Sequence, residues 1–336
     1  MKSDKLRIAL ESLKGSISSE TDAVNLTGQT ARATDNVWWA EATLPSPIST
    51  PMTLPYSKLR SIVRSLDEED EIEIEPNGPT CRVKAPATLW QLNLLNVPTE
   101  PPPEFPVINT IEASGYALLE AYKSLKHLIR TGLSKPGLMW AWTNENQELV
   151  IGDGSRLAGH HTGIKDLELP LTVLSELCRI LTVHLSEKVT FQIGEKHIRA
   201  TMRDGHFQAM LLKGPRFEVD WYNKVKDLLN EYPQVIKMSR SEIMTAINQV
   251  GITAGESTVK LTTGNGGLIL TGVDEYGNKS ASKIEMFGDL KEPISLNIDH
   301  IASAIEALAD ELIIIKVCKS VVEVSDKTQW EIMIRR

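Results

Sequence analysis

The chain has 336 residues, of which 41% are hydrophobic, so it is long enough for two or three domains with ordinary packed cores. Its formal net charge of -8 argues against a protein that wraps nucleic acid with its whole surface, although a local basic lining is compatible with an acidic total. The three cysteines lie far apart without CxxC spacing, which favours reduced thiols in a cytoplasmic protein, and no apolar run approaches the roughly 18 residues of a membrane span.

The first third of the chain predicts two amphipathic helices and the strands around them. The segment DKLRIALESLKGSI (4–17) has helical spacing and lacks the continuous apolar core of a signal peptide. The segment NVWWAEATL predicts a strand, and a second helix follows the short strand that begins at Met52. In this helix Leu59, Ile62, Val63 and Leu66 fall on one face, and the alternating EIEIE after it predicts a half-buried strand.

The middle third repeats this order after a proline-dense linker. The segment VPTEPPPEFP (97–106) is incompatible with a helix or a central strand, and it separates the first repeat from the second. A helix is predicted at 113–130, and strands are predicted after it within LMWAWTNENQELVIGDGSRLAG. A second strand-to-helix junction lies in LELPLTVLSELCRIL from Leu167, and KVTFQI after it alternates like a strand.

The last third has the same order again. A helix is predicted at 239–254, where Ser239 and Glu242 form a capping box. The turn letters GNGG at 264–267 predict a hairpin, and a further helix is predicted after ISLN. Because helix, hairpins, strand, helix and hairpins recur three times, the sequence predicts an α+β chain of three copies of one domain. The predicted domains are 1–106 (shortened), 107–232 and 233–336, with the second boundary within 224–234.

The order and spacing of these segments resemble the bacterial DNA polymerase III beta subunit, the DnaN-type sliding clamp, over nearly the full chain. The resemblance is carried by TLPYSKLRSIVRSL, by GDGSRLAG at 152–159, and by SRSEIMTAINQV with ISLNIDHIASAIEAL. That family has a Thr-Asp-Gly-His-Arg-Leu-Ala stretch in the place of Gly152–Ala158. For a distant member, the resemblance implies three clamp domains, each with two helices packed on antiparallel sheet. It also implies a head-to-tail dimeric ring with the helices inside.

The function implied by the resemblance is that of a processivity factor. Such a homodimer encircles duplex DNA without reading its sequence, and it tethers DNA polymerase and clamp-loader peptides, with no membrane involved. Attraction to DNA phosphates that does not depend on base sequence requires Lys and Arg on the helices that line the inside of the ring. The candidate DNA-binding residues are Lys5, Arg7, Lys14, Lys58, Arg60, Arg64, Lys123, Lys126 and Arg130. The helices of the third repeat are poor in basic residues, so the expected attraction is uneven around the ring.

The resemblance also implies a hydrophobic groove between the second and third domains that receives short partner peptides. The candidate groove residues, carried over by position, are Gly152, Gly154, Ser155, Arg156, Leu157, Lys224, Val225, Trp330, Ile332, Met333 and Ile334. Ser155 replaces the family's His in the loop, and Ile332-Met333-Ile334 replaces its Met-Pro-Met tail. We therefore expect a different peptide preference, and Met suits a surface that adapts to several partners.

Two other classes of protein stay open at this point. A clamp-fold adaptor of phage or plasmid type would recruit partners without encircling DNA, and the short first repeat and base-poor third repeat are compatible with it. An unrelated α+β enzyme would require an acid–base cluster that the sequence does not reveal. The segment GDGSRLAG lacks both the GK[ST] ending of a phosphate loop and the acidic ladder of a calcium loop. The sequence therefore predicts no catalytic residue, no metal and no cofactor.

Overall fold

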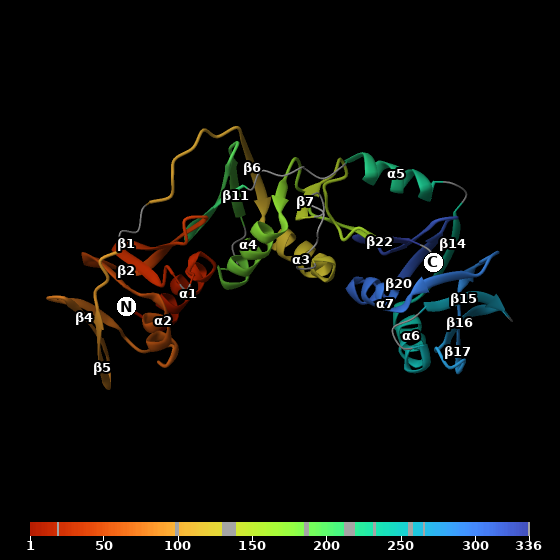
Figure 1. Ribbon diagram of the computed structural model, residues 1–336, viewed down its shortest axis with the longest axis horizontal. Coiled ribbons are helices and arrows are strands. Elements are labelled where there is room, and N and C mark those ends of the chain that lie inside the picture. The colour runs from red at the N-terminus through yellow and green to blue at the C-terminus, as the bar shows by residue number, and fades with distance from the viewer. Residues whose placement is uncertain are drawn as a thin grey trace. The chain divides into compact units, whose positions relative to one another are not determined.

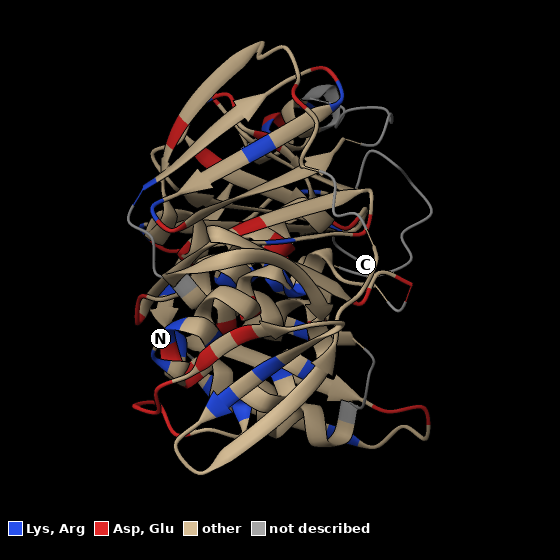
Figure 2. Ribbon diagram, turned by 90° about the vertical axis from the view of Figure 1, so that its left-hand side faces the viewer, with Lys and Arg blue, Asp and Glu red and all other residues tan. Residues whose placement is uncertain are grey.

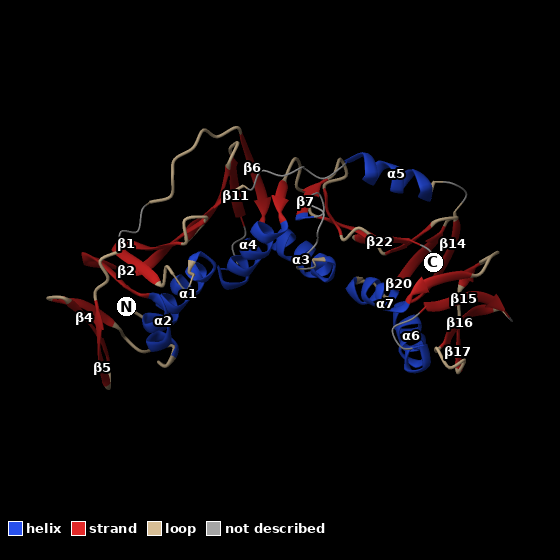
Figure 3. Ribbon diagram, in the orientation of Figure 1, coloured by secondary structure: helices blue, strands red, loops and turns tan. Residues whose placement is uncertain are grey.

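The computed structural model describes residues 1–18, 20–97, 101–129, 139–184, 188–211, 219–230, 233–254, 258–264 and 266–334. Within these ranges the chain is an α+β protein whose strands all pair antiparallel, which confirms the predicted class (Figure 3). Its contacts divide it into two compact units (Figure 1). Unit 1 is Met1–Leu119 with Thr172–Lys213, and unit 2 is Glu120–Leu171 with Gly214–Arg336. The division into domains 1–106, 107–232 and 233–336 stays a prediction.

Unit 1 combines the first predicted repeat with part of the second. Its elements are α1 (Ser3–Leu13), the 3-10 turn Lys14–Ser16, β1 (Ala23–Thr34), β2 (Trp38–Pro55), α2 (Tyr56–Arg64), β3 (Glu73–Asn77), β4 (Thr80–Ala85), β5 (Thr88–Asn93), β6 (Asn109–Ser114), most of α4 (Leu171–His184), β11 (Lys188–Ile193), β12 (His197–Met202) and β13 (Gly205–Met210). Six strands form one sheet in the order β1-β2-β13-β12-β11-β6, and β3-β4-β5 form a small second sheet.

The two N-terminal helices of unit 1 each bury one face. Leu6 and Leu10 on α1 are fully buried, as is Leu59 on α2, and their spacing of three to four residues is the one expected for amphipathic helices. The hydroxyl of Tyr56 donates a hydrogen bond to the carbonyl oxygen of Leu10 at 3.0 Å and so joins α2 to α1. Both predicted helices are confirmed, although α1 ends at Leu13 and a 3-10 turn replaces its predicted last residues.

The long hairpin of β1 and β2 accommodates four prolines within one strand. Prolines lack the N–H that a ladder requires; Pro45, Pro47 and Pro51 fall between the paired positions, and Pro55 is the last residue of β2, opposite Ala23. The register shifts on both sides of Gly28, whose φ of 56° lies in the left-handed region. These bulges allow the predicted strands NVWWAEATL and MTLP to be parts of a single strand, β2.

The proline-dense linker is fixed to the large sheet of unit 1. The side chain of Gln208 donates a hydrogen bond to the carbonyl oxygen of Pro103 at 2.9 Å. The ring of Phe105 stacks on His197 with 5.5 Å between centroids, and the guanidinium of Arg199 lies 5.4 Å from the centroid of Phe105. Residues 101–106 contain no helix or strand, as predicted.

Helix α3 (Gly115–Leu125) begins two residues later than predicted from the sequence. Residues 113 and 114 belong to β6, and the hydroxyl of Ser114 accepts a hydrogen bond from the backbone N–H of Ala117 at 3.2 Å. A serine in this position satisfies one of the free N–H groups at a helix start, which explains the boundary. The helix continues into the 3-10 turn Lys126–Leu128, and residue 130 lies outside the described residues.

Unit 2 holds the rest of the chain. Its further elements are β7 (Trp140–Thr143), β8 (Glu148–Gly152), β9 (Arg156–His161), β10 (Glu168–Pro170), α5 (Val219–Leu229), β14 (Gln234–Ser239), α6 (Arg240–Ala254), β15 (Thr258–Gly264), β16 (Gly267–Val273), β17 (Lys279–Ile284), β18 (Phe287–Gly288), β19 (Ile294–Asn297), α7 (Ile298–Ala307), β20 (Leu312–Val317), β21 (Val321–Ser325) and β22 (Gln329–Ile334). The predicted capping box is confirmed in part, since the hydroxyl of Ser239 accepts from the N–H of Glu242 at 3.2 Å. The predicted hairpin is β15–β16.

One large sheet spans most of unit 2. Its nine strands run in the order β10-β7-β8-β9-β22-β21-β20-β14-β18, and a second sheet has the order β17-β16-β15-β19. Helix α7 lies on one face of the large sheet and α5 on the opposite face (Figure 1). Side chains that alternate along β22 therefore reach two different cores: Met333 joins the core of α6 and α7, while Ile332 joins the cluster beneath α5.

Candidate peptide-binding site and basic helix faces

The segment GDGSR is a tight turn that connects β8 to β9. One carboxylate oxygen of Asp153 accepts hydrogen bonds from the N–H of Ser155 at 3.0 Å, from its hydroxyl at 2.8 Å, and from the N–H of Arg156 at 2.8 Å. Gly154 has a φ of 90°, which a side chain would strain. The turn therefore satisfies its own polar groups, and Gly152 before it is a buried strand residue.

Arg156 lies at the centre of a buried ionic network. It is only 3% exposed, and its guanidinium contacts the carboxylate of Asp153 at 2.9 Å, the hydroxyl of Ser303 at 2.8 Å and the carboxylate of Glu331 at 3.4 Å. The other oxygen of Glu331 lies 2.7 Å from Nε2 of His127. The sequence predicted Arg156 as a wall of the groove, but the structure places its side chain on the α7 face of the sheet, away from α5.

The charge of Asp153 depends on this network. Burial alone raises the pKa of Asp153, but hydrogen bonds from Ser155 and the positive charge of Arg156 outweigh burial and hold that pKa below its ordinary value of 3.8. A carboxylate with a lowered folded pKa stabilises the fold fully above its ordinary pKa. That contribution is lost as the pH falls through the lowered value.

We expect an Asp153→Asn variant to be less stable than the parent at neutral pH and to approach it in acid. The gap in unfolding free energy should be widest above about pH 4 and should shrink steadily below that value. Urea unfolding of both proteins at several pH values from about 7 to about 3 measures this difference in unfolding free energy. A gap that stays constant over this range would contradict the role assigned to Asp153.

A cluster of apolar side chains covers the opposite face of the same strands. We call it the groove cluster; its buried members from the strands and turns are Trp142, Val150, Leu157, Cys318, Val321, Trp330 and Ile332, and Leu229 of α5 packs among them. Leu157 stands opposite Ile332 in the register of β9 and β22, so both predicted groove residues are together. Ile334, also predicted for the groove, is 56% exposed. The structure thus brings Leu157, Trp330 and Ile332 onto one surface and leaves Met333 on the other face of the sheet.

Helix α5 covers the groove cluster. Tyr222, Val225 and Leu228 pack against it, and Leu157 and Ile332 are only 1% and 2% exposed beneath the helix. Lys224, predicted to border the groove, is exposed on α5. The resemblance implied that Lys224 and Val225 belong to the groove; the structure places both on a helix, with Val225 packed against the cluster.

Two polar contacts fix α5 in addition to its apolar face. The ammonium of Lys226 lies 3.6 Å from the ring centroid of Trp330, and burial lowers the pKa of this lysine. The hydroxyl of Tyr222 accepts a hydrogen bond from the side chain of Asn144 at 2.8 Å, and its ring meets Trp142 edge-on at 5.8 Å. The helix therefore has a defined register on the sheet.

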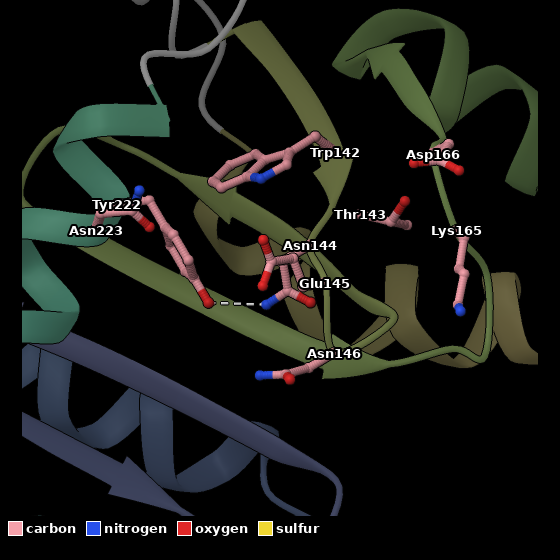
Figure 4. A pocket seen from close by; sticks show the side chains of 9 residues that line it. All are labelled: Trp142, Thr143, Asn144, Glu145, Asn146, Lys165, Asp166, Tyr222 and Asn223. Carbon is pink, nitrogen blue, oxygen red and sulfur yellow. Dashed lines mark hydrogen bonds between the residues drawn. The ribbon is translucent and has the colours of Figure 1, made fainter.

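A cavity of about 530 Å³ opens beside the N-terminal half of α5. Figure 4 shows Tyr222 and Asn223 of α5 on one side and the turn between β7 and β8 on the other. Its lining is mostly polar: Trp142, Thr143, Asn144, Glu145, Asn146, Lys165, Asp166, Tyr222 and Asn223. This composition differs from the mostly apolar lining of a typical small-molecule pocket.

Close packing of Trp330 leaves no room for a side chain on the neighbouring strand. Gly159 stands opposite Trp330, and a Cβ at Gly159 would lie 2.5 Å from an indole carbon. We expect Gly159→Ala to lower the free energy of unfolding by about 1–3 kcal/mol through overpacking. Gly251→Ala on α6 is a suitable control, because its Cβ would meet its nearest atom at 3.4 Å. Equal stabilities of the two variants in urea would contradict this account.

The basic residues predicted to face DNA divide into paired arginines and exposed lysines. In unit 1, Arg60 and Arg64 both bind Glu11 of α1 at 2.8 Å, and Arg7 binds Glu68 at 2.9 Å. Figure 2 shows acidic and basic residues close together around the N-terminus. Lys5, Lys14, Lys58, Lys123 and Lys126 are exposed and have no ion pair among the described residues.

The helices of the third predicted repeat offer less positive charge, as the sequence indicated. The guanidinium of Arg240 donates to the carbonyl oxygens of Ile305 and Glu306 at 3.0 Å, so it caps the end of α7. Arg130, a predicted DNA contact, lies outside the described residues.

No protein-family model and no curated protein matches the sequence. Solved structures do match. The DNA polymerase sliding clamp of Pseudomonas aeruginosa with a ligand is 19% identical, with a TM-score of 0.84, and the match covers 100% of this chain and 98% of that chain. The Pseudomonas aeruginosa DnaN sliding clamp bound to griselimycin is 18% identical, with a TM-score of 0.84 and the same coverage. The clamp of Caulobacter crescentus is 16% identical, with a TM-score of 0.83 and coverage of 100% and 98%. This chain has the sliding-clamp fold.

The resemblance found in the sequence is thus confirmed at the level of the fold. Within the sliding-clamp fold, sequence reasoning missed two features. One is α5, whose signal was the spacing of Tyr222, Val225 and Leu229 beside the predicted domain boundary, where no helix was predicted. The other is Glu11, a single acid that forms ion pairs with two arginines of the next helix.

The described part of the chain contains no group of His, Cys, Asp and Glu side chains arranged to hold a metal ion. It also contains no helix that is both long and apolar enough to span a membrane.

Proposed function

We propose that the chain is a distant member of the DNA polymerase III beta subunit family and acts as a DNA sliding clamp. In this proposal it consists of three repeats, 1–106, 107–232 and 233–336, and two copies pair head to tail into a ring with the helices inside. The observation that supports it best is the match of this whole chain to nearly whole clamps at a TM-score of 0.84. It is then a binding protein rather than an enzyme.

The proposed ring holds duplex DNA by weak contacts that do not read its sequence. Long, exposed lysines suit this task, because they reach phosphates without fixing a register. The five exposed lysines described above are therefore the main proposed contacts, and Arg7, Arg60 and Arg64 contribute less because each already forms an ion pair with a carboxylate. The partners proposed for the outer surface are peptides of a DNA polymerase and a clamp loader.

Retention on circular DNA tests the proposal. Size-exclusion chromatography with light scattering should give twice the mass of the chain. With a clamp loader, the protein should remain on nicked circular DNA and leave after the DNA is linearised. A protein that is strictly monomeric and is never retained on circular DNA would refute the proposed dimeric ring. If that monomer still bound polymerase peptides, the alternative of a clamp-fold adaptor would replace the proposed function.

Exposed lysines should set the salt dependence of DNA binding. We expect the triple variant Lys5→Gln, Lys14→Gln and Lys58→Gln to weaken binding. For each lysine that no longer neutralises a phosphate, the slope of log K against log salt should fall in magnitude by about 0.9. Fluorescence anisotropy with a short duplex measures the slope.

The matched control for this experiment removes the same charge elsewhere. It is a triple Lys→Gln variant at exposed strand positions, Lys237, Lys260 and Lys279. An equal decrease of the slope in both variants would mean that binding follows total charge rather than the helix faces.

A further inference from the structure

Glu11 of α1 binds two arginines of α2 with one carboxylate. Nε and Nη2 of Arg60 donate to the two oxygens of Glu11 at 2.8 Å and 2.9 Å, and Nε of Arg64 donates to the first of these oxygens at 2.8 Å. A bidentate pair of guanidinium and carboxylate is stronger and more directional than an ordinary hydrogen bond. The side chain of Glu11 is only 17% exposed, so its carboxylate has a fixed place between the two helices, which lie side by side (Figure 1).

Glu11 carries its negative charge at neutral pH. Burial raises its pKa, but the hydrogen bonds and positive charges of Arg60 and Arg64 outweigh burial and hold the pKa below its ordinary value of 4.5. Arg7 and Lys14 stand four residues before and three residues after Glu11, on the same face of the chain's first helical segment. Glu11 is therefore a negative charge set among basic side chains that were predicted to face DNA.

Unit 1 has other contacts that hold α1 in place. The hydroxyl of Tyr56 donates a hydrogen bond to the carbonyl oxygen of Leu10. The guanidinium of Arg179 on α4 donates to the backbone carbonyl oxygens of Glu11 and Ser12 at 2.7 Å and 3.1 Å, so the end of α1 is also held through its backbone. A Gln in place of Glu11 would keep the length of the side chain and one acceptor oxygen, and it would remove the charge.

The two arginines of α2 differ in how easily a phosphate can reach them. The side chain of Arg64 is 51% exposed, whereas that of Arg60 is 21% exposed. Arg64 therefore presents part of its guanidinium to solvent while it is bound to Glu11. Phosphate oxygens accept the same pair of N–H groups that a carboxylate accepts. A phosphate can thus take Arg64 from Glu11 by exchanging one pair of acceptor oxygens for another.

We propose that Glu11 competes with DNA phosphates for Arg64 and Arg60 and thereby limits the affinity of unit 1 for duplex DNA. The inference deepens the proposed function and rests on it for the presence of a duplex at these helices. The gain from each arginine contact is small, because one ion pair replaces another. When the phosphate moves away, Glu11 binds the arginine again. Weak and replaceable contacts are those that allow a protein to slide along a duplex.

This exchange has a signature in the salt dependence of DNA binding. A phosphate that binds Arg64 releases a condensed counterion, but Glu11 without its arginine attracts a cation in turn. The two changes cancel, so a paired arginine adds little to the slope of log K against log salt. An exposed lysine such as Lys58, which has no ion pair among the residues that the structure describes, adds about 0.9 to the magnitude of that slope.

The test compares Glu11→Gln with the parent by fluorescence anisotropy, using a short duplex at several salt concentrations. We expect Glu11→Gln to bind the duplex about three- to tenfold more tightly at about 0.1 M salt. The magnitude of the salt slope should rise by about 0.9 for each arginine that becomes free to bind a phosphate. Addition of Arg64→Gln to Glu11→Gln should remove most of the gain in affinity.

The matched control is Glu41→Gln. Glu41 is 21% exposed and forms an ion pair with Arg32 between β1 and β2 of the same unit. Side chains alternate along a strand, so Arg32 lies on the face opposite to the buried Ala31 and Ala33. The control removes the same charge from a similar pair on the sheet, and it should bind the duplex like the parent. Equal tightening in both variants would mean that binding follows total charge, and it would overturn the inference.

Two other results would overturn the inference. One is a Glu11→Gln variant that keeps its circular dichroism spectrum and thermal transition but binds the duplex no more tightly than the parent. The other comes from nuclear magnetic resonance of the parent protein with isotope-labelled arginine, which remains informative if Glu11→Gln fails to fold. The Nε–H signal of Arg64 should shift when duplex is added, because its acceptor changes, and that of Arg32 should not. An Arg64 signal that stays in place while the parent binds duplex would show that Glu11 keeps its arginine.

The two proposals fail separately. If the parent remains on circular DNA but Glu11→Gln binds the short duplex no more tightly, only the role of Glu11 is refuted. If Glu11→Gln binds the duplex more tightly but the parent is never retained on circles, the proposed ring is refuted and the competition at Glu11 stands. Absence of duplex binding by both the parent and the variant would refute both.

Discussion

Replacement of Arg156 by Met should lower the free energy of unfolding by about 3–5 kcal/mol. The reason is that Asp153 and Glu331 would keep their buried carboxylates without the guanidinium that compensates them. Met has a similar length, so loss of charge rather than of volume dominates. Urea unfolding, followed by tryptophan fluorescence and circular dichroism, measures the effect.

The control for this prediction is Lys237→Met, which removes an exposed positive charge from β14 of the same unit. It should change the stability by less than about 0.5 kcal/mol. A double variant, Arg156→Met with Glu331→Gln, should recover part of the loss because one uncompensated carboxylate is gone. A cost below about 1 kcal/mol for Arg156→Met would mean that the network does not stabilise unit 2.

Truncation of Trp330 should have a second large effect. The indole is 6% exposed, lies against Gly159, and supports Lys226 of α5 on its face. Trp330→Ala should therefore lower the free energy of unfolding by about 3–5 kcal/mol, since it removes buried area and leaves a cavity. Hydrogen exchange should show faster exchange of α5 than in the parent, together with the loss of global stability.

Two comparisons make the Trp330 prediction specific. Trp330→Phe keeps a ring under Lys226 and should recover more than half of the loss. Tyr276→Ala removes an aromatic ring that is 83% exposed in a turn, and it should be nearly neutral. Trp330→Ala could destabilise the whole protein while the amides of α5 exchange no faster than global unfolding explains. That result would show that the indole does not hold α5 on the sheet.

Local sequence patterns predicted the helices and strands better than they predicted the site. Apolar spacing of three or four placed α1, α2, α6 and α7, and strict alternation placed β11 with its observed bounds. Helix α5 was missed because its apolar positions lie at the predicted domain boundary within 224–234, where no helix was predicted. Its covering role depends on Trp330 and Leu157, which are distant in the chain.

The roles of charged residues were the least predictable part. Arg60 and Arg64 have no acid within their own helix, and their partner Glu11 is 49 and 53 residues away. Arg156 meets Glu331 across 175 residues. A basic side chain that will be neutralised by tertiary structure looks the same in a sequence as one that will meet a phosphate. Only the folded structure shows that Arg64 is paired with Glu11, whereas Lys58 is exposed without an ion pair among the described residues.

The central position of β22 in the large sheet affects how unit 2 is made in the cell. Strand β9 pairs with β8 on one side and with β22 on the other. The ribosome completes β9 roughly 170 residues before β22, a delay of roughly 10–30 s at ordinary elongation rates. Throughout this time one edge of β9 is unpaired beside apolar side chains, which is the kind of surface on which nascent chains aggregate. Synthesis of unit 2 should therefore be sensitive to chaperone supply, and the same holds for unit 1, where β2 remains unpaired on one edge until β13 is made.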